Sequence, residues 1–195
     1  SDKELKKLHQ QKKPFVAFIQ TASNHMPFTV PDQKENYTPT SKDDISEDLL
    51  EKSGFKSLAQ LNALRYLDFN IGHFLKRAKK SGYYKNTVFV FFGDHNTAMN
   101  RTDKYTNEYD LNIQLQHVPL IIHAPNILQP KVISKNGKLI DLFPTVMSLI
   151  KMNHTNYTLG RNLLDTNNQT KTSSFVYLKI NGEPAVGILQ DSLYY

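Results

Sequence analysis

The tripeptide Gly93-Asp94-His95 directly follows an apolar run and combines residue types that can bind a metal ion. A carboxylate and an imidazole are ligands suited to Zn²⁺, Mn²⁺ or Mg²⁺. Adjacent side chains of a strand point to opposite faces, so both reach one ion only where the backbone has left the strand, which Gly93 permits. An Asp-His pair alone also fits a capped turn with a hydrogen-bonded histidine. The strand and the glycine before it favour the metal site.

A second candidate residue is His25, which stands between Ser23-Asn24 and Met26-Pro27-Phe28 after another apolar run. An imidazole there can donate a hydrogen bond to an anionic oxygen. A histidine that simply packs in the loop fits the sequence equally well, and both interpretations stay open at this point.

The other histidines carry weaker signals. His123 lies between apolar neighbours and fits a structural histidine, while His117 precedes its strand and is expected at the opposite edge of the sheet. Surface positions explain the remaining ones, which are His9, His73 and His154. We find no Gly-x-Ser-x-Gly motif, no glycine-rich phosphate loop and no cysteine, so no nucleophile is evident.

Three nearly continuous apolar runs predict buried strands at residues 15–19, 87–92 and 118–122. Each run leads into a polar segment that contains a histidine. If the strands are parallel, these segments meet at one edge of the sheet, and ligands bind beyond the carboxyl ends of such strands.

Helical spacing of apolar residues predicts a long helix from residue 58 to residue 78, with Gly82 as its C-cap. We expect shorter helices up to about Gln11 and over residues 141–150, and a terminal hairpin of residues 174–180 and 185–190. The predicted fold is a three-layer α/β domain with a mostly parallel central sheet and a C-terminal β-hairpin. No internal domain boundary is evident.

Composition excludes several classes of protein. The 195 residues contain no cysteine, which rules out a disulfide scaffold and thiolate chemistry. The net charge of +6 is spread along the chain without a nucleic-acid-binding motif, so we expect no nucleic-acid partner. A polyanionic substrate or an anionic membrane surface suits the charge better. No apolar run approaches the length of a membrane span.

Several motifs taken together resemble the lipoteichoic acid synthase-like phosphoglycerol transferases, in the sulfatase branch of the alkaline phosphatase superfamily. The similar segments keep the family's order and span nearly the whole chain; they are residues 15–28, 66–75, 81–88, 92–95, 117–125, 140–145 and 160–164. This ordered set is far more specific than any single motif.

The resemblance implies an alkaline-phosphatase-like fold in which Asp94 and His95 bind a catalytic divalent ion and His25 contacts oxygens of the substrate. The ion is expected to be Mn²⁺ or Zn²⁺, or else Mg²⁺ or Ca²⁺. The substrate is expected to be a phosphoester of a phospholipid or a cell-envelope glycopolymer. In the family, a metal-activated threonine attacks the ester, and an acceptor alcohol or water resolves the covalent intermediate.

The chain departs from this family pattern by an absence. The nucleophile and an acidic metal ligand of the family lie upstream of the segment that resembles Ser1 onward, as do its membrane-spanning helices. We therefore expect residues 1–195 to be the C-terminal portion of an extracytoplasmic catalytic domain that is membrane-anchored in the full-length protein. Alone, this portion is expected to be inactive and to bind metal weakly. Its oligomeric state is left open.

Two alternatives remain. A sulfatase or phosphodiester hydrolase would use water in place of an acceptor alcohol. A non-catalytic module would keep the fold and bind a cell-surface glycopolymer through its positive charge, with no metal at Asp94 and His95.

Overall fold

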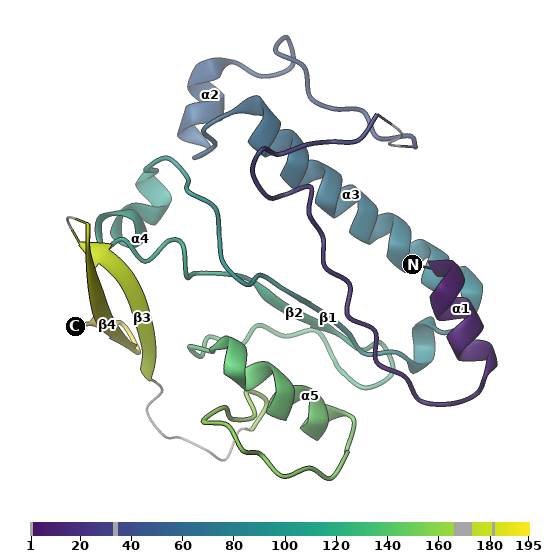
Figure 1. The fold of residues 1–195 in the computed structure, drawn as a ribbon. Coiled ribbons are helices and arrows are strands. Elements are labelled where there is room, and N and C mark those ends of the chain that lie inside the picture. The colour runs from purple at the N-terminus through teal and green to yellow at the C-terminus, as the bar shows by residue number, and fades with distance from the viewer. Residues whose placement is uncertain (1, 33–34, 166–172, 181) are drawn as a thin grey trace. The chain divides into compact units, whose positions relative to one another are not determined.

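The computed structural model describes residues 2–32, 35–165, 173–180 and 182–195 (Figure 1). The helices are α1 (Asp2–Gln10), α2 (Glu47–Lys52), α3 (Leu58–Ser81), α4 (Thr106–Asp110) and α5 (Leu142–Leu149), with 3₁₀ turns η1 (Tyr84–Asn86), η2 (Asp103–Tyr105) and η3 (Leu139–Asp141). The strands are β1 (Phe89–Phe92), β2 (Leu120–His123), β3 (Ser173–Ile180), β4 (Glu183–Gln190) and β5 (Leu193–Tyr194). Across the described residues, no helix combines the length and apolarity needed to cross a membrane.

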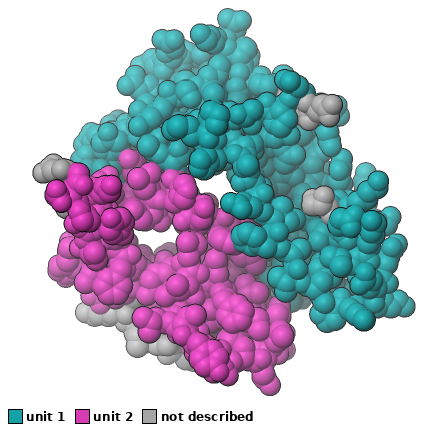
Figure 2. Space-filling view, viewed as in Figure 1, with its two compact units in different colours: residues 1–89, 97–110, 123–127 teal, residues 90–96, 111–122, 128–195 magenta. Residues whose placement is uncertain are grey.

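The chain forms two compact units, coloured separately in Figure 2. Unit 1 comprises residues 1–89, 97–110 and 123–127, and unit 2 comprises residues 90–96, 111–122 and 128–195. Because the chain passes between the units several times, a search for linkers in the sequence does not detect them.

The long helix α3 confirms the prediction from helical periodicity. Its first turn is capped by Ser57, whose Oγ accepts from the Gln60 N–H at 3.1 Å. It ends at Gly82, where φ is +86°, a left-handed conformation that glycine adopts without strain. The short helix α1 and the helix α5 are likewise confirmed at nearly the expected positions.

A polar loop is tied to α3 by one buried asparagine. The Asn62 side chain accepts from the Thr40 N–H at 2.7 Å and donates to the Thr40 carbonyl at 2.9 Å. The buried Tyr37 donates to the Asn62 carbonyl at 2.9 Å and packs edge-on against Tyr66. These bonds fix a segment whose sequence predicts only a loop.

The pairing of β1 with β2 differs from the parallel arrangement that we expected for the central strands. The two strands are hydrogen-bonded neighbours. The Gly93 N–H, just after β1, donates to the Pro119 carbonyl, just before β2, at 3.3 Å. The rings of Phe89 and His123, at the start of β1 and the end of β2, have centroids 6.0 Å apart. Contacts in this order are those of an antiparallel pair. Both predicted strands therefore exist, but the expected direction of β2 is wrong.

The predicted strand at residues 15–19 is wrong as well. These residues form no strand, and Val16 and Phe18 are 96 % and 78 % exposed. An apolar run favours a strand, but a strand also requires a hydrogen-bonding neighbour, which the sequence of the run does not specify.

The start of α5 and a later turn form one cluster in unit 2. Asp141 is fully buried, and its carboxylate accepts from the backbone N–H groups of Lys138 at 2.8 Å and Arg161 at 2.9 Å. A side chain at Gly160 would place its Cβ 2.0 Å from the Ile140 carbonyl oxygen, so only glycine fits. Two segments that the sequence singles out are thus parts of one structural cluster.

The predicted hairpin is confirmed as β3 and β4, which pair in antiparallel register, with β5 added to β4. One face of β3 is buried through Val176 and Leu178, while Phe175 and Tyr177 on the other face are 70 % and 60 % exposed. This alternation is typical of a sheet that is covered on one side.

Candidate functional site

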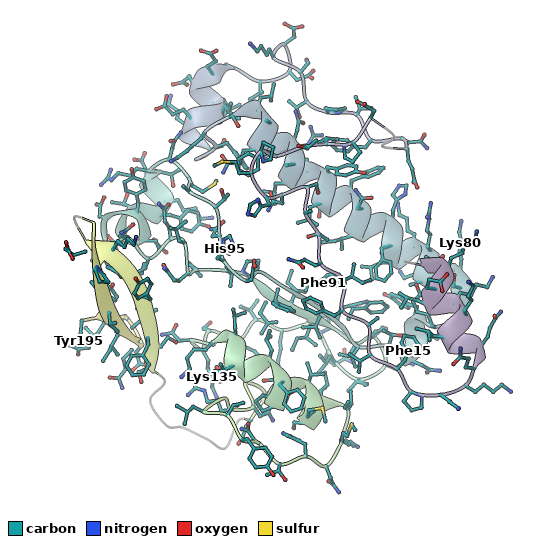
Figure 3. The ribbon with its side chains drawn as sticks, in the orientation of Figure 1. Phe15, Lys80, Phe91, His95, Lys135 and Tyr195 are labelled. Carbon is teal, nitrogen blue, oxygen red and sulfur yellow. The ribbon has the colours of Figure 1, made fainter. Side chains whose placement is uncertain are left out.

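The candidate site begins where β1 ends, and Figure 3 labels His95 beyond that end. Gly93 allows the chain to leave the strand beside the neighbouring segment, since a Cβ at this position would lie 3.0 Å from the Cβ of Val118. The next turn is closed by Asp94, whose Oδ1 accepts from the His95 N–H at 2.9 Å. Glycine and aspartate therefore form the local bend that the sequence predicts.

The bend brings the side chains of Asp94 and His95 together. Oδ2 of Asp94 lies 3.9 Å from Nε2 of His95, and the two side chains are 74 % and 62 % exposed. Nδ1 of His95 lies 3.0 Å from the Asn96 carbonyl oxygen, which can only accept a hydrogen bond. Nδ1 therefore carries the hydrogen, and Nε2, the nitrogen nearer to Asp94, is the basic one.

This pair has the chemistry and the spacing of part of a metal site. A second-sphere bond to a backbone carbonyl is the usual way to orient a ligand histidine. With metal–ligand bonds of about 2.0–2.2 Å, one ion can join the two atoms after a small closure of their 3.9 Å separation. Within the described parts of the chain, no group of three histidine, aspartate or glutamate side chains is close enough to hold an ion. Asp94 and His95 thus fit a divalent ion as two of its ligands.

His25 lies in a tight turn of unit 1. Its N–H donates to the Ala22 carbonyl at 3.0 Å, its carbonyl accepts from the Phe28 N–H at 2.7 Å, and its Nδ1 lies 2.8 Å from the Met26 carbonyl oxygen. The side chain is exposed. Asp94 and His95 belong to unit 2, so the contact of His25 with their substrate stays a prediction.

His123 is a structural residue, as expected. Its Nε2 lies 2.6 Å from the Tyr84 hydroxyl, and its ring packs near the rings of Tyr84 and Phe89, with centroids 5.4 Å and 6.0 Å away. The other surface histidines have local partners: His73 lies 3.2 Å from Glu35, and His154 packs on Phe143.

His117 was expected at the wrong edge of the sheet, and that expectation is incorrect. The Asn96 side-chain amide donates to the His117 carbonyl at 3.5 Å, so this histidine lies beside the bend that carries Asp94 and His95. The reason is the antiparallel direction of β2, which brings its N-terminal end to the C-terminal end of β1. Strand periodicity carries no direction, and the sequence therefore gave no signal for this placement.

Fold and site together define an α/β domain of the alkaline-phosphatase-like class, with an acidic residue and a histidine at the end of a strand. A family model described as Sulfatase matches residues 1–152, so the chain belongs to the sulfatase family. This confirms the family resemblance recognised from the sequence motifs.

Individual relatives are consistent with this assignment. The chain is 37 % identical over 161 residues to the lipoteichoic acid synthase-like protein YvgJ of Bacillus subtilis (strain 168), which covers 76 % of this chain and 24 % of the relative. It is 30 % identical over 188 residues to lipoteichoic acid synthase 2 of the same organism, covering 87 % of this chain and 27 % of that protein. The chain therefore spans about a quarter of the length of these relatives.

A solved structure shows the same fold. The crystal structure of the lipoteichoic acid synthase LtaP from Listeria monocytogenes superimposes with a TM-score of 0.68 at 21 % identity, covering 97 % of this chain and 50 % of that one. At this identity, the likeness establishes the α/β fold and leaves the activity to be argued from the site.

Proposed function

We propose that this chain is the C-terminal part of the catalytic domain of a divalent-metal-dependent phosphoglycerol or phosphoethanolamine transferase. The observation that carries the proposal is the approach of Asp94 and His95 to 3.9 Å at an exposed strand end of a sulfatase-family chain. The similarity to lipoteichoic acid synthases supports a phosphoester of a membrane lipid or cell-envelope glycopolymer as the substrate.

Each candidate residue has a distinct role in this proposal. Asp94 supplies a carboxylate oxygen and His95 its basic Nε2 as two ligands of the ion, which acts as a Lewis acid on the phosphoryl group. The Asn96 carbonyl holds the His95 ring in the required tautomer. His25 donates a hydrogen bond to a substrate oxygen. The nucleophile and the remaining ligands come from the part of the domain upstream of Ser1, and we expect this chain to be inactive alone.

The proposed location follows from the same relationship. The full-length protein acts on the outer side of the cell membrane and is held there by segments outside residues 1–195. The net charge of +6 favours substrates and surfaces that carry negative charge.

The test uses the protein that comprises this chain and the upstream part of its domain. Asp94→Asn replaces a charged ligand with a neutral one, and it should abolish both phosphoglycerol transfer and bound Mn²⁺ as measured by elemental analysis. Asp48→Asn is the matched control, because Asp48 is a similarly exposed carboxylate that pairs with Lys52 on α2. Full activity and full metal content in Asp94→Asn would refute the proposed site.

Hydrolysis is the second candidate, favoured by the family's description as Sulfatase. Product analysis separates the two activities. A transferase moves labelled glycerol phosphate to an acceptor alcohol, whereas a hydrolase releases it, or sulfate, to water. If the protein neither holds a metal nor turns over either ester, the non-catalytic glycopolymer-binding module is the correct interpretation.

The inactivity of this chain alone is tested separately, with a chromogenic phosphodiester and Mn²⁺ or Zn²⁺. Turnover by residues 1–195 that Asp94→Ala abolishes would show that the nucleophile lies within them.

A further inference from the structure

A second histidine lies opposite the Asp94–His95 bend within unit 2. The bend and the segment before β2 run alongside each other in opposite directions. At one end the Gly93 N–H donates to the Pro119 carbonyl at 3.3 Å, and at the other end the Asn96 N–H donates to the Leu115 carbonyl at 2.7 Å. These two bonds bracket residue 117 on one side and residues 94 and 95 on the other.

The position of His117 is fixed by its neighbours rather than by a free loop. The Asn96 amide donates to the His117 carbonyl itself. The Gln116 side chain donates to the Tyr177 carbonyl on β3 at 2.7 Å, and the Asn112 side chain donates to the Lys179 carbonyl at 3.1 Å. The segment that carries His117 is therefore anchored to the bend and also to the neighbouring sheet.

The side chain of His117 is exposed, as are those of Asp94 and His95. A substrate phosphoryl group held at the Asp94–His95 end would have several anionic oxygens, and only some of them face the metal. An imidazole on the opposing segment can donate an N–H to the others, and hydrogen bonds to charged oxygens are the stronger kind.

We propose that His117 is a further residue of this site, which contacts the phosphoryl oxygens of the substrate from the segment opposite Asp94 and His95. The inference rests on the proposed function and adds a substrate-binding residue to it. His117 is not a metal ligand in this proposal, so its removal weakens substrate binding and leaves the metal in place.

The experiment again uses the protein that comprises this chain and its upstream part. His117→Gln should raise KM for the phosphodiester by about tenfold, the size expected for one lost hydrogen bond to a charged group, with kcat changed by less than about twofold. Bound Mn²⁺ should be unchanged. His117→Arg keeps an N–H donor with a positive charge and should restore KM to within about threefold of the starting value. His154→Gln is the matched control, an exposed histidine of unit 2 that packs on Phe143.

The outcomes separate this inference from the proposed function. An unchanged KM in His117→Gln, together with loss of activity in Asp94→Asn, overturns the inference and leaves the proposed function standing. Loss of bound Mn²⁺ in His117→Gln, or a failure of His117→Arg to restore KM, also overturns it. If Asp94→Asn leaves activity and metal unchanged, the proposed function fails, and this inference fails with it.

A measurement on the unaltered protein guards against a folding defect in the variants. Diethyl pyrocarbonate modifies exposed imidazoles, and mass spectrometry of peptides reports the rate at each histidine. With Mn²⁺ present, inorganic phosphate should slow modification of His117 and leave that of His154 unchanged. Equal rates at His117 with and without phosphate would contradict the inference.

Discussion

At the scale of single residues, surroundings give the same side chain different roles. His95 is exposed beside a carboxylate, whereas His123 is held by the Tyr84 hydroxyl and two aromatic rings. The buried Tyr83 is a further case, because its hydroxyl donates to the carboxylate of Asp2 at 2.8 Å and joins the start of α1 to the end of α3. Burial, and then the hydrogen bond to Asp2, raises the pKa of Tyr83 above its ordinary value.

The raised pKa of Tyr83 predicts a loss of stability in alkali. The folded protein favours the neutral phenol, so its contribution is fully present below the unfolded pKa of about 10 and is lost as the pH rises above it. Tyr83→Phe should cost about 1 kcal/mol of unfolding free energy at pH 7, because the bond to Asp2 is lost. It should cost less at pH 11, where the original protein must bury a charge. Urea denaturation at both pH values measures the difference.

Tyr157→Phe is the control for this prediction, because Tyr157 is 92 % exposed. Its unfolding free energy should match that of the original protein at both pH values. An equal cost of Tyr83→Phe at pH 7 and pH 11 would show that the buried phenol does not govern the alkaline response.

At the scale of elements, helices could be predicted well and strand pairing could not. The start, the end and the caps of α3 are written in local residue types, such as Ser57 and Gly82. The direction of β2 and the pairing of residues 15–19 depend on distant segments, and apolar runs carry no such information. As a result Asp94 and His95 could be identified as a pair, while His117 could not be placed beside them.

Two glycines allow a matched test of close packing. Gly160→Ala should destabilise the chain by about 3 kcal/mol or more, because the new Cβ would overlap the Ile140 carbonyl oxygen. Gly72→Ala should stabilise it by up to about 1 kcal/mol, because Gly72 lies inside α3 and nothing lies within 4 Å of a Cβ placed there. Chemical denaturation measures both values. Equal effects of the two changes would mean that the cluster around Asp141 can shift freely.

The link between α3 and the preceding loop is a third test. Asn62→Ala removes both bonds to Thr40 and should cost about 2 kcal/mol, since the loop backbone loses its buried partner. Limited proteolysis should then cut residues 37–44 faster than in the original protein. Asn70→Ala, at an exposed position of the same helix, should leave the cleavage rate unchanged. Unchanged cleavage in Asn62→Ala would show that other contacts hold the loop.

At the scale of the whole molecule, the described chain leaves much apolar surface exposed. Val16 and Phe18 are 96 % and 78 % exposed in the run of residues 15–19, and β3 exposes Phe175 and Tyr177. Patches of this kind in soluble proteins usually mark surfaces that contact other protein or promote association.

Residues 1–195 alone are therefore expected to self-associate through the run of residues 15–19. Val16→Lys places a charge in that run and should shift sedimentation velocity profiles toward the monomer. Val132→Lys is the control, because Val132 is similarly exposed at 93 % but lies outside the run. Identical profiles for the two variants would show that association, where present, uses another surface.

The close approach of Gly93 to Val118 links chemistry with architecture at a single position. A methyl group added at residue 93 would push apart two segments that carry Asp94 and His95 on one side and His117 on the other. A mutational scan scored for growth would then find position 93 as intolerant as its two neighbours, although its own side chain touches no substrate. Swapping Val118 for a smaller residue could relieve that intolerance, and such a suppressor pair would be a genetic trace of the contact.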